Sequence, residues 1–257
     1  MIRAVRWSNR TLPQGWFDAI RQLALFASAY YLYRIVRGLV DGQATLAFDN
    51  ARTLVDIEQG LGLFFEPAVQ GWALGEGWVL DGANWMYINS HFVVTIGFLV
   101  WLYLFRNHAF YFVRNMFMVA MFLALVGYVA FPTAPPRFMP EWGFTDTVSA
   151  FVGEAASRSA SLLYNPFAAV PSMHVAFALM IGIPAAMLVK TRVLKVAWSL
   201  YPVAVTFVVL VTGNHFWLDA FLGALVAAIS AYVAKAGLAR ARPAAWSWRR
   251  ARAEAAV

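Results

Sequence analysis

Long apolar stretches alternate with short polar connections along most of the chain. A helix that spans a membrane needs roughly 20 consecutive, mostly apolar residues, and several stretches are of this kind. We therefore predict an all-α membrane protein built as a bundle of six transmembrane helices. The six predicted spans cover residues 16–37, 84–105, 110–131, 173–190, 194–212 and 215–235.

Two segments outside these spans have patterns of their own. Residues 44–66 mix apolar and polar positions in the way typical of an amphipathic helix. This helix can lie on the outer membrane surface or pack on the bundle, and both interpretations fit the pattern. Residues 131–172 are rich in Pro, Ser and Gly and predict a long loop, which in a compact domain is usually functional. The apolar residues of segment 44–66 are Leu46, Leu54, Ile57, Leu61 and Phe64.

The composition supports a membrane protein. Hydrophobic residues make up 61% of the chain and charged residues only 13%, so a soluble globule would lack the polar side chains needed to cover its surface. The chain has no cysteine, which excludes disulfides, thiolate nucleophiles and thiolate metal ligands. We predict a single membrane domain over residues 1–257, with a catalytic core at about 84–235 and a basic tail at about 236–257.

Charge indicates the orientation. Lysine and arginine gather in the first ten residues, from Arg106 to Arg114, from Lys190 to Lys195, and from Lys235 onward, whereas most acidic residues lie in segments 41–83 and 132–172. Because basic connections stay in the cytoplasm, we predict cytoplasmic termini and extracytoplasmic acidic segments, as in a bacterial-type inner membrane. The same rule accounts for the net charge of +7 without nucleic acid binding.

The topology places three short segments on the outer side: Pro132 to Arg137, Pro171 to His174, and Gly213 to Asp219. In the last segment, His215 and Asp219 are four residues apart, which puts them on one helical face within hydrogen-bond reach. A carboxylate that holds one ring nitrogen leaves the other free to act as a nucleophile. Attack on phosphorus by this nitrogen would give a phosphohistidine, which splits one difficult transfer into two easier steps.

The other two segments predict an acid and an anion site. His174 is in the first turn of its helix, where the helix dipole disfavours the imidazolium and makes it a better proton donor. Ser172 opens that helix and Asn214 is a suitable N-cap for the last one, so two helix N-termini can face an anion. Arg137, in a stiff Pro-rich turn, can add a fork of hydrogen bonds to phosphate oxygens.

Other polar residues have more than one interpretation. His91, Asn84 and Tyr87, near the outer end of the second span, can line a pocket for an acceptor molecule, or can form hydrogen bonds between helices. Two histidines and an aspartate can also bind zinc, but the chain lacks an HExxH spacing and its cationic groups suit an anion better. We therefore predict no metal and no other cofactor.

The three segments resemble the type 2 phosphatidic acid phosphatase superfamily, and more closely its branch of inositolphosphotransferases and inositol phosphorylceramide synthases. The resemblance rests on Pro132 to Arg137, Asn165 to His174 and Gly213 to Asp219, and it covers about 84–235. It implies a six-helix bundle with a metal-independent site at the outer membrane interface. In that site His215 would be the nucleophile, Asp219 its orienting partner, His174 the general acid and Arg137 a phosphate ligand.

The sequence departs from the hydrolytic members of this superfamily in two places. Their first motif carries a lysine and an arginine-proline pair, whereas this chain has Pro135-Pro136-Arg137. Those members carry an arginine six residues before the nucleophilic histidine, and here that position is Val209. Asn214 and the helix N–H groups would then compensate part of the phosphate charge. Further cations that can replace the arginine are Arg34, Arg37, Arg114 and Arg158, although the topology puts Arg114 on the inner side.

Three functions fit these residues. The first is a lipid phosphotransferase, in which a phospholipid or polyprenyl phosphate donates to His215 and an alcohol such as a polyol accepts. The second is a lipid phosphate phosphatase, which uses water as the acceptor and the same catalytic residues. The third is a non-enzymatic lipid-binding protein, which would have no need for His215, Asp219 and His174 together.

Overall fold

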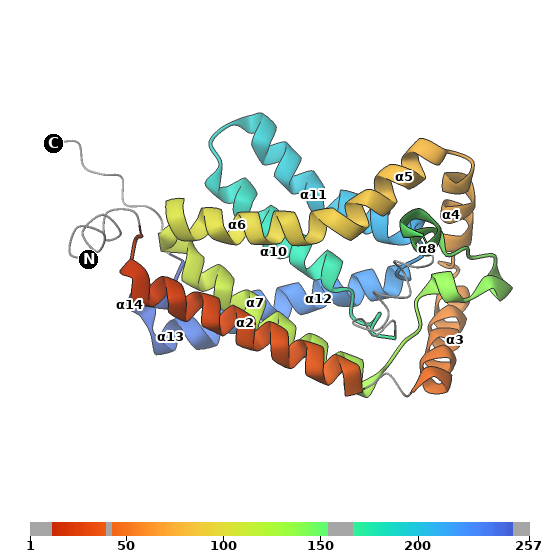
Figure 1. Cartoon of the computed structure of the whole chain (residues 1–257), viewed down its shortest axis with the longest axis horizontal. Helices are drawn as coiled ribbons and strands as arrows, with labels where there is room; N and C mark the ends of the chain where they lie inside the picture. Colours follow the sequence, from red (N-terminus) through yellow and green to blue (C-terminus); the bar gives the residue numbers. More distant parts are fainter. Residues whose placement is uncertain (1–11, 40–42, 154–166, 249–257) are drawn as a thin grey trace.

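The computed structural model describes residues 12–39, 43–153 and 167–248 (Figure 1). These residues form helices joined by short connections, and among them the only strand-like feature is an isolated bridge between Thr133 and Ala168. The predicted all-α fold class is therefore confirmed.

Short π-helical turns, η1 and η4, join neighbouring α-helices without a break. As a result α5 and α6 form one continuous helix, and α12 continues into α13. The helical elements are α2 (Gly15–Leu39), α3 (Ala44–Gly60), α4 (Glu66–Leu74), α5 (Gly77–Trp85), η1 (Met86–Ser90), α6 (His91–Phe105), α7 (Asn107–Ala130), η2 (Pro136–Phe138), η3 (Pro140–Trp142), α8 (Thr147–Val152), α10 (Met173–Leu188), α11 (Arg192–Val211), α12 (Trp217–Val233), η4 (Ala234–Leu238), α13 (Ala239–Ala241) and α14 (Pro243–Trp246).

Four helices among the described residues are long and apolar enough to cross a membrane. They are Gly77–Phe105, Asn107–Ala130, Arg192–Val211 and Trp217–Ala241. These four agree with four of the predicted spans. The last of them continues to Ala241, beyond the predicted end at residue 235.

The other two predicted spans are helices of a different kind. Helix α2 is 25 residues long but contains Asp18, Arg21, Arg34 and Arg37, which lower its hydropathy. Helix α10 has 16 residues, which at 1.5 Å per residue gives about 24 Å, less than the roughly 30 Å of a bilayer core. The count of six spans therefore stays a prediction.

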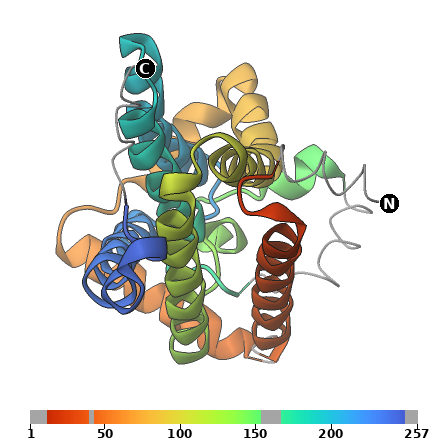
Figure 2. The same cartoon turned by 90° about the vertical axis from the view of Figure 1, so that its left-hand side faces the viewer.

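The long helices α2, α6, α7 and α12 run along the long axis of the molecule (Figure 1). Helix α7 lies between α2 and α12, and it packs against both (Figure 2). The short helix α10 packs against α7, α11 and α12, and more than half of its residues are buried. Its N-terminus also lies inside the protein, because Ser172 and Met173 are both buried.

The two ends of the bundle differ. Helices α3, α4 and α8 gather at one end, and α13 and α14 lie at the other (Figure 1). Helix α3 buries one face, formed by Ala47, Ala51, Leu54 and Val55, in a cluster that includes Phe216. This helix thus packs directly on the segment that leads into α12.

The buried face of α3 is not the face predicted from its apolar residues. Leu54 is buried and Phe64 is partly buried against the same cluster, but Leu46, Ile57 and Leu61 are exposed. Small alanines take the inner positions because the helix approaches the neighbouring loop closely, as the bond from Ala134 N–H to the carbonyl of Ala47 shows. Packing on the protein, one of the two interpretations, is observed.

Candidate active site

His215 and Asp219 meet at the start of α12. Nδ1 of His215 lies 3.3 Å from Oδ2 of Asp219, so the predicted contact between these residues is confirmed. The same Oδ2 accepts the N–H of Phe216 at 3.0 Å, and the side chain of Asp219 is fully buried. The bond from Phe216 holds the carboxylate in place, the contact with Nδ1 orients the imidazole, and Nε2 is the nitrogen that Asp219 leaves unengaged.

The turn before α12 differs from the prediction for Asn214. The N-cap of α12 is Phe216 rather than Asn214, and the side-chain nitrogen of Asn214 donates backwards to Oγ1 of Thr212 at 2.7 Å. The reason is the left-handed Gly213, whose φ of +63° turns the chain before the helix begins. Asp219, at the third position of the helix, performs the capping instead.

Ser172 is the N-cap of α10, as predicted, and its N–H donates to the backbone carbonyl of Asp219 at 3.0 Å. The two helix starts touch because Gly223 of α12 has no side chain: a Cβ there would collide with the carbonyl oxygen of Ser172. The hydroxyl of Ser172 is buried and has no hydrogen-bond partner among the described residues. An unsatisfied buried hydroxyl is expensive unless a ligand completes it.

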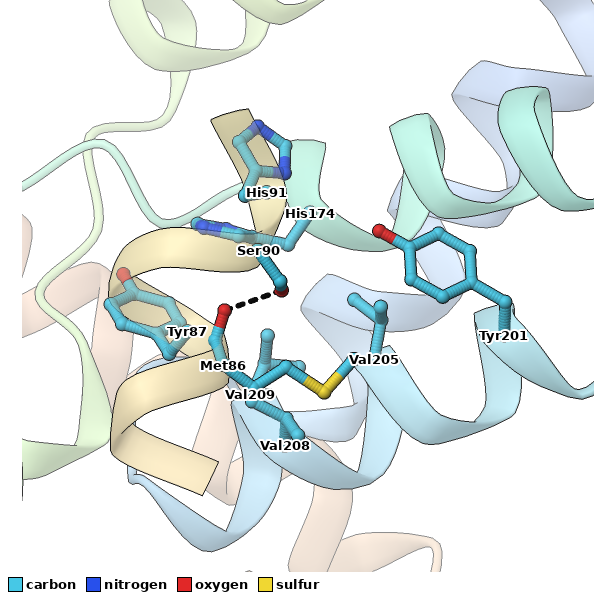
Figure 3. Close-up of a pocket in the computed structure, with 9 residues that line it drawn as sticks. All are labelled: Met86, Tyr87, Ser90, His91, His174, Tyr201, Val205, Val208 and Val209. Atoms are coloured by element: carbon cyan, nitrogen blue, oxygen red, sulfur yellow. Dashed lines mark hydrogen bonds between the residues drawn. The ribbon is translucent and has the colours of Figure 1, made fainter. Parts of the chain in front are cut away.

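His174 forms the centre of an aromatic cluster. Its ring centroid is 5.7 Å from that of His215, 4.6 Å from that of Tyr87 and 4.4 Å from that of His91. Figure 3 shows His91, Tyr87 and His174 around one small pocket, with Tyr201 and valines of α11 on the other side. The structure thus brings together both predicted catalytic histidines and two of the three predicted acceptor residues.

Asn84, the third predicted acceptor residue, does not line this pocket. Its Oδ1 accepts a hydrogen bond from Oγ1 of Thr147 at 3.1 Å, and both side chains are buried. The alternative interpretation, a hydrogen bond between helices, therefore describes Asn84, because it ties α5 to α8.

Arg137 lies beside the turn that precedes His215. Its backbone N–H donates to the carbonyl of Gly213 at 2.7 Å, and its side chain is largely buried. One guanidinium nitrogen is 3.6 Å from Oδ1 of Asp146, the group stacks on the ring of Phe138, and the buried Nε has no partner among the described residues. Part of its donor capacity therefore remains for a ligand.

The other candidate cations do not join this site among the described residues. Arg114 bonds to Gln22 and Asn115 and lines a separate cavity near α2 and α14. Arg158 lies outside the described residues, as do the side chains of Arg34 and Arg37. Val209 is fully buried, and its carbonyl accepts the N–H groups of Asn214 and His215.

Two glutamates that the sequence did not indicate hold the start of α12. Oε1 of Glu66 accepts the N–H of Trp217 at 2.8 Å, and Oε1 of Glu58 accepts the N–H of Leu218 at 3.0 Å. These two N–H groups are therefore already satisfied and are not available to an anion. At the N-terminus of α10, by contrast, the hydroxyl of Ser172 has no partner among the described residues.

A weak sequence signal exists for one of these glutamates. Glu58 follows Leu54 and Val55 on the stripe of α3 that also contains Ala47 and Ala51. A carboxylate on an otherwise apolar stripe is unusual, because burial of a charge needs compensating partners. Glu66 has no such signal, since it begins a new helix after a turn.

A family model described as the PAP2 superfamily matches residues 52–233, which include the second half of α3 and the helices α10, α11 and α12 of the site. Comparisons with curated proteins and with solved structures gave no match.

Proposed function

Because this chain belongs to the PAP2 superfamily, a family of phosphoesterases, we propose that it transfers or hydrolyses the phosphate ester of a membrane lipid through a phosphohistidine. Family membership supports an activity on lipid phosphates, and the four long apolar helices support a membrane location. The observation that carries the mechanism is the buried contact between His215 and Asp219.

In the proposed first step, Asp219 keeps the proton of His215 on Nδ1, so the lone pair of Nε2 attacks phosphorus. A P–N bond forms as the P–O bond to the leaving alcohol breaks. The imidazolium that develops is stabilised by the neighbouring carboxylate.

His174 is the proposed general acid. Its place in the first turn of α10 disfavours the imidazolium, and its ring contacts that of His215. It donates its proton to the oxygen that leaves phosphorus. In the second step it takes a proton from the acceptor, whose oxygen attacks phosphorus and releases His215.

Ser172 and Arg137 are the proposed phosphate ligands. Support comes from the unpartnered buried Oγ of Ser172 and the unpartnered Nε of Arg137. The first turn of α10 adds backbone N–H donors and a favourable dipole. Asn214 is the less favoured ligand, because its amide nitrogen is engaged by Thr212.

Transfer to an alcohol is favoured over hydrolysis. His91 and Tyr87 border His174 on the proposed acceptor side, and the pocket is otherwise lined largely by apolar side chains, Val209 among them. An apolar wall beside His174 disfavours free water there. The resemblance to inositolphosphotransferases points to a polyol as the acceptor, and to a phospholipid or polyprenyl phosphate as the donor.

We place the site on the extracytoplasmic side, with both termini in the cytoplasm. The support is the distribution of basic and acidic residues between alternate connections, and the opposite placement of α3 and α14 along the bundle (Figure 1). The chemistry proposed for His215 and His174 requires no metal ion.

Turnover of the purified protein in detergent, with EDTA present, tests this function. The substrates are a panel of phospholipids, phosphatidic acid and polyprenyl phosphates, each with and without inositol or another polyol, and His215→Ala is the matched variant. A product that depends on the polyol and is lost in the variant supports the transferase. Free phosphate released without a polyol identifies a phosphatase, and products unaffected by His215→Ala would contradict both activities.

A further inference from the structure

Glu58 and Glu66 are the most unusual charged residues outside the proposed catalytic set. Both side chains are fully buried, and they come from different helices, α3 and α4. Their carboxyl groups are within hydrogen-bond reach of each other. Each directs one oxygen to a backbone N–H of the first turn of α12.

The pair needs a proton. The second oxygens, Oε2 of Glu58 and Oε2 of Glu66, are buried and receive no donor among the described residues. Two adjacent carboxylates without cations repel each other, and one shared proton converts the repulsion into a hydrogen bond. Burial, followed by the charge of Glu66, raises the pKa of Glu58 to about 9, so this proton is present at neutral pH.

We propose that Glu58 and Glu66, as a singly protonated carboxyl pair, are positioning residues that hold the start of α12 and thereby His215 and Asp219 in catalytic geometry. This role rests on the function proposed above. The pair does not contact the reacting atoms, and it acts through the backbone of Trp217 and Leu218.

The connection from the pair to the chemistry is short. Trp217 and Leu218 follow His215 and Phe216 directly, and Asp219 comes next. The first N–H groups of a helix lack intrahelical partners. Without Glu58 and Glu66, the N–H groups of this turn would have to bind water, or the turn would fray. Phe216, buried against α3, joins the same two elements by packing. Helices α3 and α4 thus determine where the nucleophile stands.

Charge distinguishes this pair from ordinary helix caps. The groups whose charge acts on Glu58 are Glu66 on α4 and Asp219 on α12, both acidic. Loss of the shared proton would therefore place three carboxylates together, and among the described residues no cation forms an ion pair with Glu58 or Glu66. The start of α12 would then shift at alkaline pH, and the distance between His215 and its substrate would change.

Four variants test the proposal in the full-length protein. Glu58→Ala and Glu66→Ala each remove one acceptor, and a small displacement of the nucleophile lowers kcat by up to about 100-fold while KM changes little. Glu58→Gln keeps an acceptor for Leu218 and a donor for Glu66, so it retains most of kcat. Asp56→Asn, on the exposed face of α3, is the control and leaves kcat unchanged.

The pH profile separates positioning from simple stability. In the wild type, kcat falls as Glu58 loses its proton near pH 9, and in Glu58→Gln this alkaline decline is absent. A merely structural role would change the amount of folded protein with pH but not kcat per folded molecule. An identical alkaline decline in wild type and Glu58→Gln would overturn the proposal, as would an unchanged kcat in both alanine variants.

A readout independent of activity covers the case in which the proposed function fails. Amide hydrogen exchange at residues 215–220, followed by mass spectrometry, is expected to accelerate in Glu58→Ala but not in Asp56→Asn. Faster exchange with no His215-dependent product would support the positioning role of Glu58 and Glu66 while rejecting phosphotransfer. Unchanged exchange in Glu58→Ala would reject the positioning role.

Discussion

The backbone N–H of Arg137 donates to the carbonyl oxygen of Gly213 across 2.7 Å. This bond joins the loop after α7 to the turn before α12, two segments far apart in the sequence. It fixes where the side chain of Arg137 begins relative to His215, and it links a proposed phosphate ligand to the proposed nucleophile.

Arg137→Ala is expected to weaken phosphate binding. Loss of a hydrogen bond to a charged group costs about 1.5–3 kcal/mol, so KM should rise about tenfold or more with a smaller effect on folding. Arg137→Lys should retain only part of the phosphate affinity, because an ammonium group cannot form the two parallel hydrogen bonds of a guanidinium group. Inhibition constants for inorganic phosphate measure the effect. Arg52→Ala is the control, because the side chain of Arg52 is half-exposed. Equal constants for Arg137→Ala and wild type would reject the assignment.

Asp219→Asn is expected to keep the fold and lose most of the rate. An asparagine can still accept the N–H of Phe216, but it cannot hold the Nδ1 proton as a carboxylate does. Loss of tautomer and orientation lowers kcat by up to about 10⁴-fold in comparable pairs. Steady-state turnover and circular dichroism give the comparison, and near-normal turnover would remove the role of Asp219.

His174→Ala should impair substrates according to their leaving group. A general acid matters most for an alkoxide and least for a phenolate that departs without a proton. We expect a loss of about 10²–10⁴-fold with a lipid phosphate, and a much smaller loss with an aryl phosphate. Equal losses for both substrates would show that His174 does not donate the proton.

Gly213→Ala tests the turn before the nucleophile. A side chain there meets the left-handed conformation and, in addition, Nε2 of Gln70 at 2.7 Å. Gly62→Ala is the matched control, because Gly62 has a similar φ of +67° but open space around it. Both variants pay the cost of the left-handed backbone, about 1–2 kcal/mol, and only Gly213→Ala should also lower kcat. Equal kcat values would contradict this.

Glu58→Gln should change how stability depends on pH. Glu58 has its pKa raised from 4.5 to about 9 on folding, so between these values the folded protein holds one proton more than the unfolded chain. The free energy of unfolding therefore falls as pH rises through this window. In Glu58→Gln the fall should be smaller, which thermal unfolding in detergent between pH 5 and 9 can measure. An unchanged slope would mean that Glu58 does not carry the proton.

The sequence predicted the parts of the site that depend on local spacing. The contact of His215 with Asp219 was predicted from their four-residue spacing, although His215 lies just before the N-cap Phe216 and not on α12 itself. Ser172 takes the predicted N-cap position of α10, but its hydroxyl forms no capping hydrogen bond. The three segments of the site could also be grouped before the fold was known, because the charge pattern placed them on one side.

The parts that failed depend on neighbours distant in the sequence. Asn214 is a good N-cap by type, yet Phe216 takes that position because the chain turns at the left-handed Gly213, whose carbonyl is held by the distant Arg137. Asn84 was predicted to line the acceptor pocket, but its side chain accepts a hydrogen bond from Thr147 of α8 instead. Glu58 and Glu66 accept hydrogen bonds from backbone N–H groups of α12. The pattern of side chains along the sequence does not indicate which N–H groups a distant carboxylate will reach.

The contact of Gly223 with the carbonyl of Ser172 has a consequence for how the protein can evolve. A single hydrogen atom in place of a methyl group sets how closely α10 and α12 approach, and each helix carries one of the two histidines near its start. Enlarging that position would widen the gap between the proposed acid and the proposed nucleophile without touching either. The spacing of the two histidines therefore depends on a residue that has no reactive side chain.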